Sequence, residues 1–286
     1  MGAQRGQITL VCLGLSAIIS GATLMNAPNR PKKTLELSLI ENARSFVAEA
    51  LAKAVSAEQV PEQWKFAILH LVQAIELSLK ELLKQQHPIL IYKNVDKPEF
   101  TVSLEGALQR LKQVTAFELK PDESKALVFA AKVRNEIVHH EFKADPAELK
   151  PAFARLFGFL VDFHRTHCDY TIEEKVPRAL WFDGLKIKEY GEELYRRAEV
   201  RLKADHVEDC VISCPKCGWR ALPGFGENAE RCYVCSHVTA LETCDRCQTV
   251  MLHGEGNEHG NKTLCQSCLE YVTDDYWHDS AKERGI

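Results

Sequence analysis

The sequence predicts a mainly α protein: an antiparallel helical bundle followed by a small β-rich domain at the C-terminus. Two observations support this fold class. Apolar residues recur at helical spacing in five segments of the first two thirds of the chain. Nine of the 11 cysteines fall between Cys210 and Cys268. The length of 286 residues suits two domains. With 45% hydrophobic and 27% charged residues, the composition excludes a wholly disordered or fibrous protein.

We divide the chain into four parts. Residues 1–34 hold an apolar segment and a polar arm, and residues 35–169 form the predicted helical bundle. Residues 170–209 are a connector, and residues 210–286 form the cysteine-rich domain. This last part carries a net charge of −4, whereas positive and negative side chains balance in the rest of the chain. The protein therefore has no overall basic surface of the kind that binds nucleic acid without specificity.

The apolar run Ile8–Met25 is 18 residues long, which is just enough to span a bilayer. One basic residue, Arg5, precedes the run, and three follow it between residues 30 and 33. The positive-inside rule would then leave the rest of the chain in the cytosol. Three hypotheses remain: an inner-membrane anchor, a cleaved signal peptide, and a start of translation at Met25. Since reduced cysteine pairs suit the cytosol, we expect a cytoplasmic protein, with anchoring by residues 8–25 as the alternative.

The five predicted helices are placed by their apolar periodicity and by the residues at their ends. Pro61 and Pro88 flank the second helix, and Asp145-Pro146 is typical of a helix start. The segment Pro88–Val102 has no helical periodicity and is expected to be a loop. The predicted ranges are Leu39–Ala54, Ile68–Leu82, Leu104–Val114, Pro121–His140 and Asp145–Val161. Short connections between such helices favour an antiparallel bundle.

The connector is expected to hold a hairpin and a helix. Asp183-Gly184 lies between apolar flanks in the segment Val176–Lys188, which is a typical hairpin signal. The charged segment Tyr190–Lys203 has apolar residues at helical spacing. We expect this part to bridge the bundle and the cysteine-rich domain.

The fourth helix carries the first chemical signal. Arg134 falls within the apolar stripe that runs from Leu127 to Val138, and a guanidinium is costly to bury without an anionic partner. A structural ion pair with a neighbouring helix is one interpretation. Asn135 and His139 lie one turn apart on an adjacent face. Arg134 and His139 are about 140° apart on an ideal helix, so they would meet more readily across the two-fold axis of a dimer.

The segment Arg134-Asn135-x3-His139 closes a bundle whose second helix reads FAILHLVQAIELSLKELL. It resembles the HEPN family, all-helical domains with an Arg-x(4–6)-His motif. The resemblance implies a homodimeric, metal-independent endoribonuclease of the kind found in toxin–antitoxin and other defence systems. It further implies that Arg134 holds the scissile phosphate, that Asn135 orients the site and that His139 transfers a proton. His140 also satisfies the family spacing; we favour His139 because Asn135 shares its face of the helix.

This chemistry is coherent. Cleavage of RNA requires a base that takes the proton of the 2′-hydroxyl, and histidine ionises near neutral pH. A fixed guanidinium offsets the charge that develops on the phosphorus. The expected products carry 2′,3′-cyclic phosphate ends. The alternative is a non-catalytic HEPN and zinc-ribbon adaptor that binds RNA or a protein, because several relatives of this kind have lost catalysis.

Eight cysteines form four CxxC pairs, separated by 14, 8 and 17 residues. The pairs are Cys214 with Cys217, Cys232 with Cys235, Cys244 with Cys247, and Cys265 with Cys268. Pairs at these separations are typical of zinc ribbons with four thiolates on each ion. We therefore predict two structural zinc sites, with sequential pairing favoured over a cross-braced arrangement. Cys210 is left without a role.

The sequence does not decide what the zinc ribbons bind. Trp219, Phe225 and Tyr233 offer aromatic contact surface, but the net charge of −4 in residues 210–286 opposes non-specific binding to phosphates. RNA docking, docking of a protein such as an antitoxin, and capping of the bundle are all compatible with this composition.

Overall fold

The computed structural model describes residues 35–115, 117–168, 170–225 and 229–273. The apolar run Ile8–Met25 lies outside these residues. Within the described part of the chain, no helix combines the length and the apolar character needed to cross a membrane.

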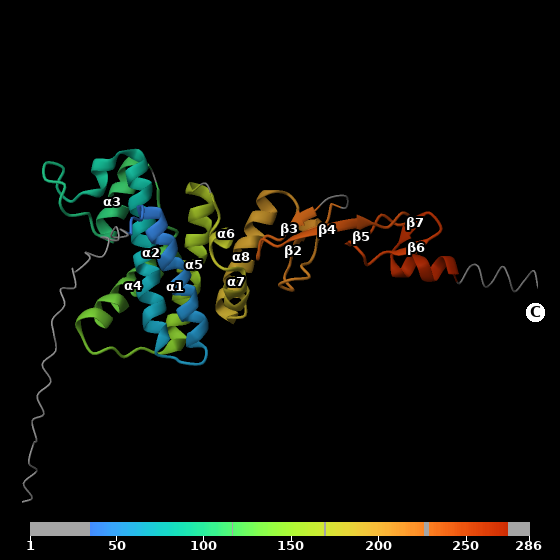
Figure 1. The fold of residues 1–286 in the computed structure, drawn as a ribbon, viewed down its shortest axis with the longest axis horizontal. Helices are drawn as coiled ribbons and strands as arrows, with labels where there is room; N and C mark the ends of the chain where they lie inside the picture. Colours follow the sequence, from blue (N-terminus) through green and yellow to red (C-terminus); the bar gives the residue numbers. More distant parts are fainter. Residues whose placement is uncertain (1–34, 116, 169, 226–228, 274–286) are drawn as a thin grey trace, which may run out of the picture. The chain divides into compact units, whose positions relative to one another are not determined.

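All five predicted helices are confirmed, and three more follow them in the connector (Figure 1). Two short 3-10 helices, η1 and η2, lie at Pro88–Ile91 and Glu208–Cys210. The α-helices are α1 Leu39–Ala57, α2 Gln63–Gln86, α3 Leu104–Val114, α4 Pro121–His139, α5 Pro146–His167, α6 Ile172–Lys175, α7 Arg178–Leu185 and α8 Lys188–Ala204. Local side chains fix several starts. Ser38 and Glu41 form a capping box on α1, and the Asp145 carboxylate accepts the Ala147 N–H over 2.9 Å at the start of α5.

Helix α2 lies at the centre of the helical body. It contacts α1, α3, α4 and α5, which explains why apolar residues cover more of its surface than one stripe. Its side chains Ile68, Leu71, Ile75 and Leu79 are fully buried. Removing a leucine of this kind typically costs about 2–5 kcal/mol, so α2 is the main structural support of the bundle.

The predicted hairpin in the connector is wrong, because Arg178–Leu185 form the helix α7. A Cβ atom on Gly184 would lie 2.7 Å from Cδ1 of Leu51, so the glycine permits close approach of α7 to α1 and does not form a turn. Trp181, on the same helix, is buried in the core. The predicted helix Tyr190–Lys203 is confirmed as α8.

The segment between α2 and α3 is a loop, as expected, apart from η1 and an isolated antiparallel bridge between Tyr92 and Thr101.

The C-terminal part is built of short antiparallel strands, followed by a helix at residues 266–273, and confirms the predicted fold class. The strands are β1 Val211–Ser213, β2 Arg220–Pro223, β3 Ala229–Arg231, β4 Val238–Thr243, β5 Val250–Leu252, β6 Asn257–His259 and β7 Lys262–Leu264. They form the sheets β1-β2, β3-β4-β5 and β6-β7. Strand β4 serves two hairpins: its first half pairs with β3, with Thr239 opposite Glu230, and its second half pairs with β5, with Glu242 opposite Met251.

Candidate functional site

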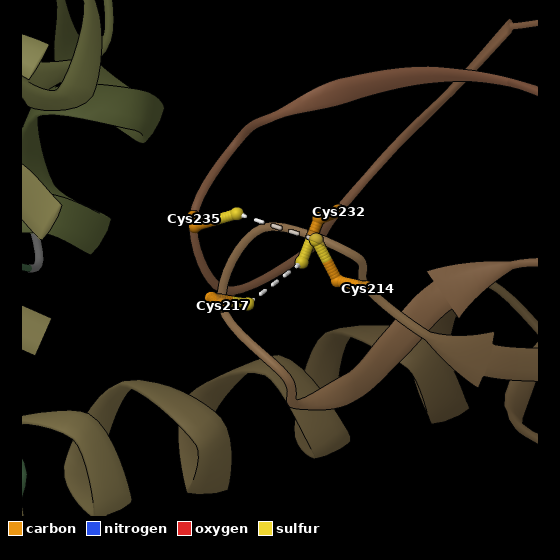
Figure 2. A group of neighbouring side chains, drawn as sticks. All are labelled: Cys214, Cys217, Cys232 and Cys235. Atoms are coloured by element: carbon orange, nitrogen blue, oxygen red, sulfur yellow. Dashed lines mark hydrogen bonds between the residues drawn. The ribbon is translucent and has the colours of Figure 1, made fainter.

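The first four-cysteine cluster has the geometry of a zinc site. The sulfur atoms of Cys214, Cys217, Cys232 and Cys235 lie within 4.8 Å of one another and converge from two loops (Figure 2). The Sγ–Sγ distance is 3.7 Å both between Cys214 and Cys235 and between Cys217 and Cys232. A tetrahedron with Zn–S bonds of about 2.3 Å has edges of about 3.8 Å, so a zinc ion fits without rearrangement.

The second cluster repeats this arrangement with Cys244, Cys247, Cys265 and Cys268, which again lie within 4.8 Å of one another. Cys247 and Cys265 are separated by 3.7 Å between their sulfur atoms. The sequential pairing predicted from the spacing is therefore confirmed, and the cross-braced alternative is not adopted. Four protein ligands close each site, which is the pattern of structural zinc.

All four CxxC turns share one backbone hydrogen bond. The N–H that follows the second cysteine donates to the carbonyl of the first over 2.9 Å, from Gly218 to Cys214, from Ser236 to Cys232, from Gln248 to Cys244 and from Leu269 to Cys265. The first three donors have φ angles of 78°, 57° and 62°. Glycine adopts such angles freely, which fits the predicted turn at Gly218, while Ser236 and Gln248 adopt them at some energetic cost. In the fourth pair, residues 266–273 are helical.

The thiols of the second cluster differ in their local environment. The backbone N–H of Cys247 is the main cause that lowers the pKa of Cys244 to about 6. Burial is the main cause that raises the pKa of Cys268 in the same cluster to about 12. Four thiolates so close together repel one another, and a divalent ion removes that cost.

The first zinc cluster is attached to the helical body through its second CxxC turn. The Arg201 guanidinium on α8 donates to the backbone carbonyl of Tyr233 over 2.6 Å, and the Tyr233 hydroxyl donates to Asp205 over 2.6 Å. The Ser236 hydroxyl donates to the Glu173 carboxylate on α6 over 3.0 Å. These contacts fix the loop between Cys232 and β4 to α6 and α8.

A buried ion network continues from this contact into the bundle. Arg197 on α8 is 4% exposed, and its guanidinium lies 2.9 Å from Glu123 on α4, 2.7 Å from Asp162 on α5 and 2.8 Å from Glu193. Asp162 also lies 2.7 Å from Arg201. Sequence reasoning missed this network. The sequence did contain a signal for it: Arg197 falls among the apolar positions of α8, just as Arg134 falls within the apolar stripe of α4.

An open groove of about 1380 Å³ lies against α3 and α4 and reaches α2 and the loop before α3. Arg134, Asn135 and His140 line it. His139 is exposed and is not among the lining residues, so within one chain the histidine that shares the groove with Arg134 is His140. The predicted apolar stripe of α4 is rotated: Val133 is buried, whereas Val138 is 57% exposed. The reason is that α4 packs against α2 and α5 through the face that includes Glu123 and Ala130.

Arg134 is half-buried and, among the described residues, makes no ion pair or hydrogen bond. Two other cations of the groove are engaged. Arg110 donates to the carbonyls of Leu90 and Tyr92 over 2.6 and 2.7 Å, and Lys80 forms an ion pair with Glu76. Within the described part of the chain, the structural interpretation of Arg134 as one half of an ion pair therefore has no support.

Comparison of this chain with protein-family models, with curated proteins and with solved structures returned no match. The HEPN resemblance thus depends on the helical bundle and on the residues of α4, from Arg134 to His140.

Proposed function

We propose that the protein is a metal-independent HEPN-type endoribonuclease that acts as a homodimer and uses its two zinc ribbons as structural and docking elements. The observation that carries the proposal is the half-buried guanidinium of Arg134, which lacks an anionic partner among the described residues and lines a groove beside Asn135 and His140. A guanidinium in this setting is a favourable site for a phosphate.

In this proposal Arg134 binds the scissile phosphate and offsets the charge of the pentavalent transition state. A histidine takes the proton of the attacking 2′-hydroxyl, and Asn135 orients the substrate. His140 can serve the groove of its own chain. His139, which faces outward, would act in the groove of a second copy, as the two-fold arrangement expected from the sequence requires.

The eight cysteines would hold two zinc ions, whose contribution is folding free energy in a region with a small apolar core. With four thiolates on each ion, neither site offers an open coordination position for a substrate. We therefore assign the reaction to α4 and propose that the ribbons dock the RNA or a protein such as an antitoxin. The biological role would be that of a toxin or defence effector in the cytosol.

The test is a cleavage assay on a labelled structured RNA in the presence of EDTA, with the zinc content of the protein measured in parallel. We expect Arg134→Ala to lose at least about 100-fold in rate, and either His139→Ala or His140→Ala to do the same. Lys125→Ala, an exposed change on the same helix, is the matched control. Unchanged cleavage in Arg134→Ala and in both histidine variants refutes the site. RNA that is bound but never cut would favour the non-catalytic adaptor.

A further inference from the structure

The loop between α2 and α3 contributes Lys93 and Thr101 to the lining of the groove, and Phe100 directly precedes Thr101 (the loop is seen next to α3 in Figure 1). Next to the isolated bridge between Tyr92 and Thr101, the N–H of Lys93 donates to the carbonyl of Phe100 over 2.7 Å. This backbone hydrogen bond holds Lys93 and Phe100 next to each other where the two arms of the loop meet. Lys93 lines the groove.

The base of this loop is fixed by two cations. Arg110 on α3 binds the carbonyls of Leu90 and Tyr92, and the ammonium of Lys80 on α2 donates to the Thr101 hydroxyl over 2.9 Å. Lys80 is only 5% exposed. Burial of an ammonium is costly unless its partners are in place, so the base of the loop is held in one position relative to the groove.

Two apolar side chains of the loop are exposed among polar and charged ones, including Asp96, Lys97 and Glu99. The side chain of Phe100 is 73% exposed, and that of Val95 is 53% exposed. Phe100 thus offers an exposed ring on an anchored loop, and Lys93 and Arg134 both line the groove that the loop borders. A stacking surface and cations along the path of the backbone are the two elements of single-strand recognition.

We propose that Phe100 and Lys93 form a stacking subsite for an unpaired base of the RNA. The base lies on the Phe100 ring, a neighbouring phosphate contacts the Lys93 ammonium, and the strand continues into the groove toward Arg134. The inference rests on the proposed ribonuclease function and adds that the substrate is single-stranded at this point, because the faces of paired bases in a duplex are not accessible to a side chain. Phe100 is thus a positioning residue and does not take part in proton transfer.

The test compares Phe100→Ala, Phe100→Trp and the matched control Val95→Ala in the full chain. The probe is a labelled single-stranded oligoribonucleotide with 2′-O-methyl groups, which cannot be cleaved, and the same sequence as a duplex serves as its counterpart. Phe100→Ala should weaken single-strand binding by about 5- to 140-fold and leave duplex binding unchanged. Phe100→Trp should retain the affinity, and the emission of its added indole should be quenched when the oligonucleotide binds. Val95→Ala should behave as wild type.

In cleavage of the unmodified RNA, Phe100→Ala should raise KM more than it lowers kcat, as expected for a residue that only positions the strand. Wild-type affinity of Phe100→Ala together with unchanged emission of Phe100→Trp overturns the subsite and leaves the ribonuclease proposal intact; Phe100 would then be assigned to a protein contact. Failure of the wild-type protein to bind any RNA overturns both.

Discussion

Gly158 on α5 is the most informative place to perturb the structure, because a single methyl group there meets the buried ion network. A Cβ atom at this position would lie 2.6 Å from Nε and 3.1 Å from Cδ of Arg197, and 3.2 Å from Cγ of Glu193. Real Cβ atoms do not approach other atoms to 2.6 Å, so Gly158→Ala must displace the Arg197 side chain. Glu123 on α4, which lies 2.9 Å from that guanidinium, would then lose its partner.

Two opposing effects set the magnitude. Alanine in place of glycine within a helix stabilises the folded state by about 1 kcal/mol. Disruption of a buried ion pair costs about 3–5 kcal/mol, since it leaves a carboxylate buried without its partner. We therefore expect Gly158→Ala to lower the free energy of unfolding by about 2–4 kcal/mol, measured by urea denaturation with zinc present.

Gly106→Ala on α3 is the matched control. A Cβ atom at Gly106 meets Cβ of Val102 at 3.4 Å, an ordinary contact, so this change should be neutral or stabilising. In an Arg197→Met background the clash at Gly158 should be much smaller, and the two changes should be strongly non-additive. A Gly158→Ala protein as stable as wild type would refute the argument that the glycine exists to make room for Arg197.

Three further predictions follow from the structure. Burial and, to a lesser extent, the charge of Arg44 lower the pKa of His164 to about 4 from its ordinary value of 6.5. Between pH 4 and pH 6.5 the folded state therefore binds fewer protons than the unfolded state, and about 3 kcal/mol of stability present above pH 6.5 should be lost as the pH falls to 4. In urea denaturation at several pH values, His164→Gln should show a weaker dependence of the unfolding free energy on pH. The same pH dependence in wild type and variant would contradict this assignment. Gln248→Gly should raise the unfolding midpoint by relieving the left-handed backbone at φ 62°, and a lower midpoint would show that the Gln248 side chain matters more than its backbone. Cys235→Ser should reduce the zinc content measured by atomic emission from two ions per chain to one, while Cys210→Ser should keep both.

Local sequence patterns predicted most of the secondary structure and all of the zinc ligands. The spacing of apolar residues identified α1 to α5 and α8, because an amphipathic helix repeats every 3.6 residues wherever it packs. The CxxC pairs identified both clusters, because two thiolates separated by two residues can bind one metal ion in a single turn.

Predictions were less accurate where the role of a residue depends on a helix that is distant in the sequence. Asp183-Gly184 predicted a turn, but the glycine is needed to bring α7 close to Leu51 on α1. The stripe of α4 was placed with Val138 inside, whereas packing against α2 and α5 leaves that side chain exposed. In both cases the residue types were compatible with two environments, and only the neighbouring helix decided between them.

The sequence by itself determined where the helices lie and which cysteines share a metal ion, since both depend on contacts between residues close in the chain. It also singled out Arg134 as an arginine within an apolar stripe of its helix. Only the tertiary structure showed that Arg134 and His140 line one groove, that Lys93 of the loop between α2 and α3 lines it too, and that Arg197 joins α4, α5 and α8. These relations link residues up to 74 positions apart, and such distances are set by the packing of the whole bundle.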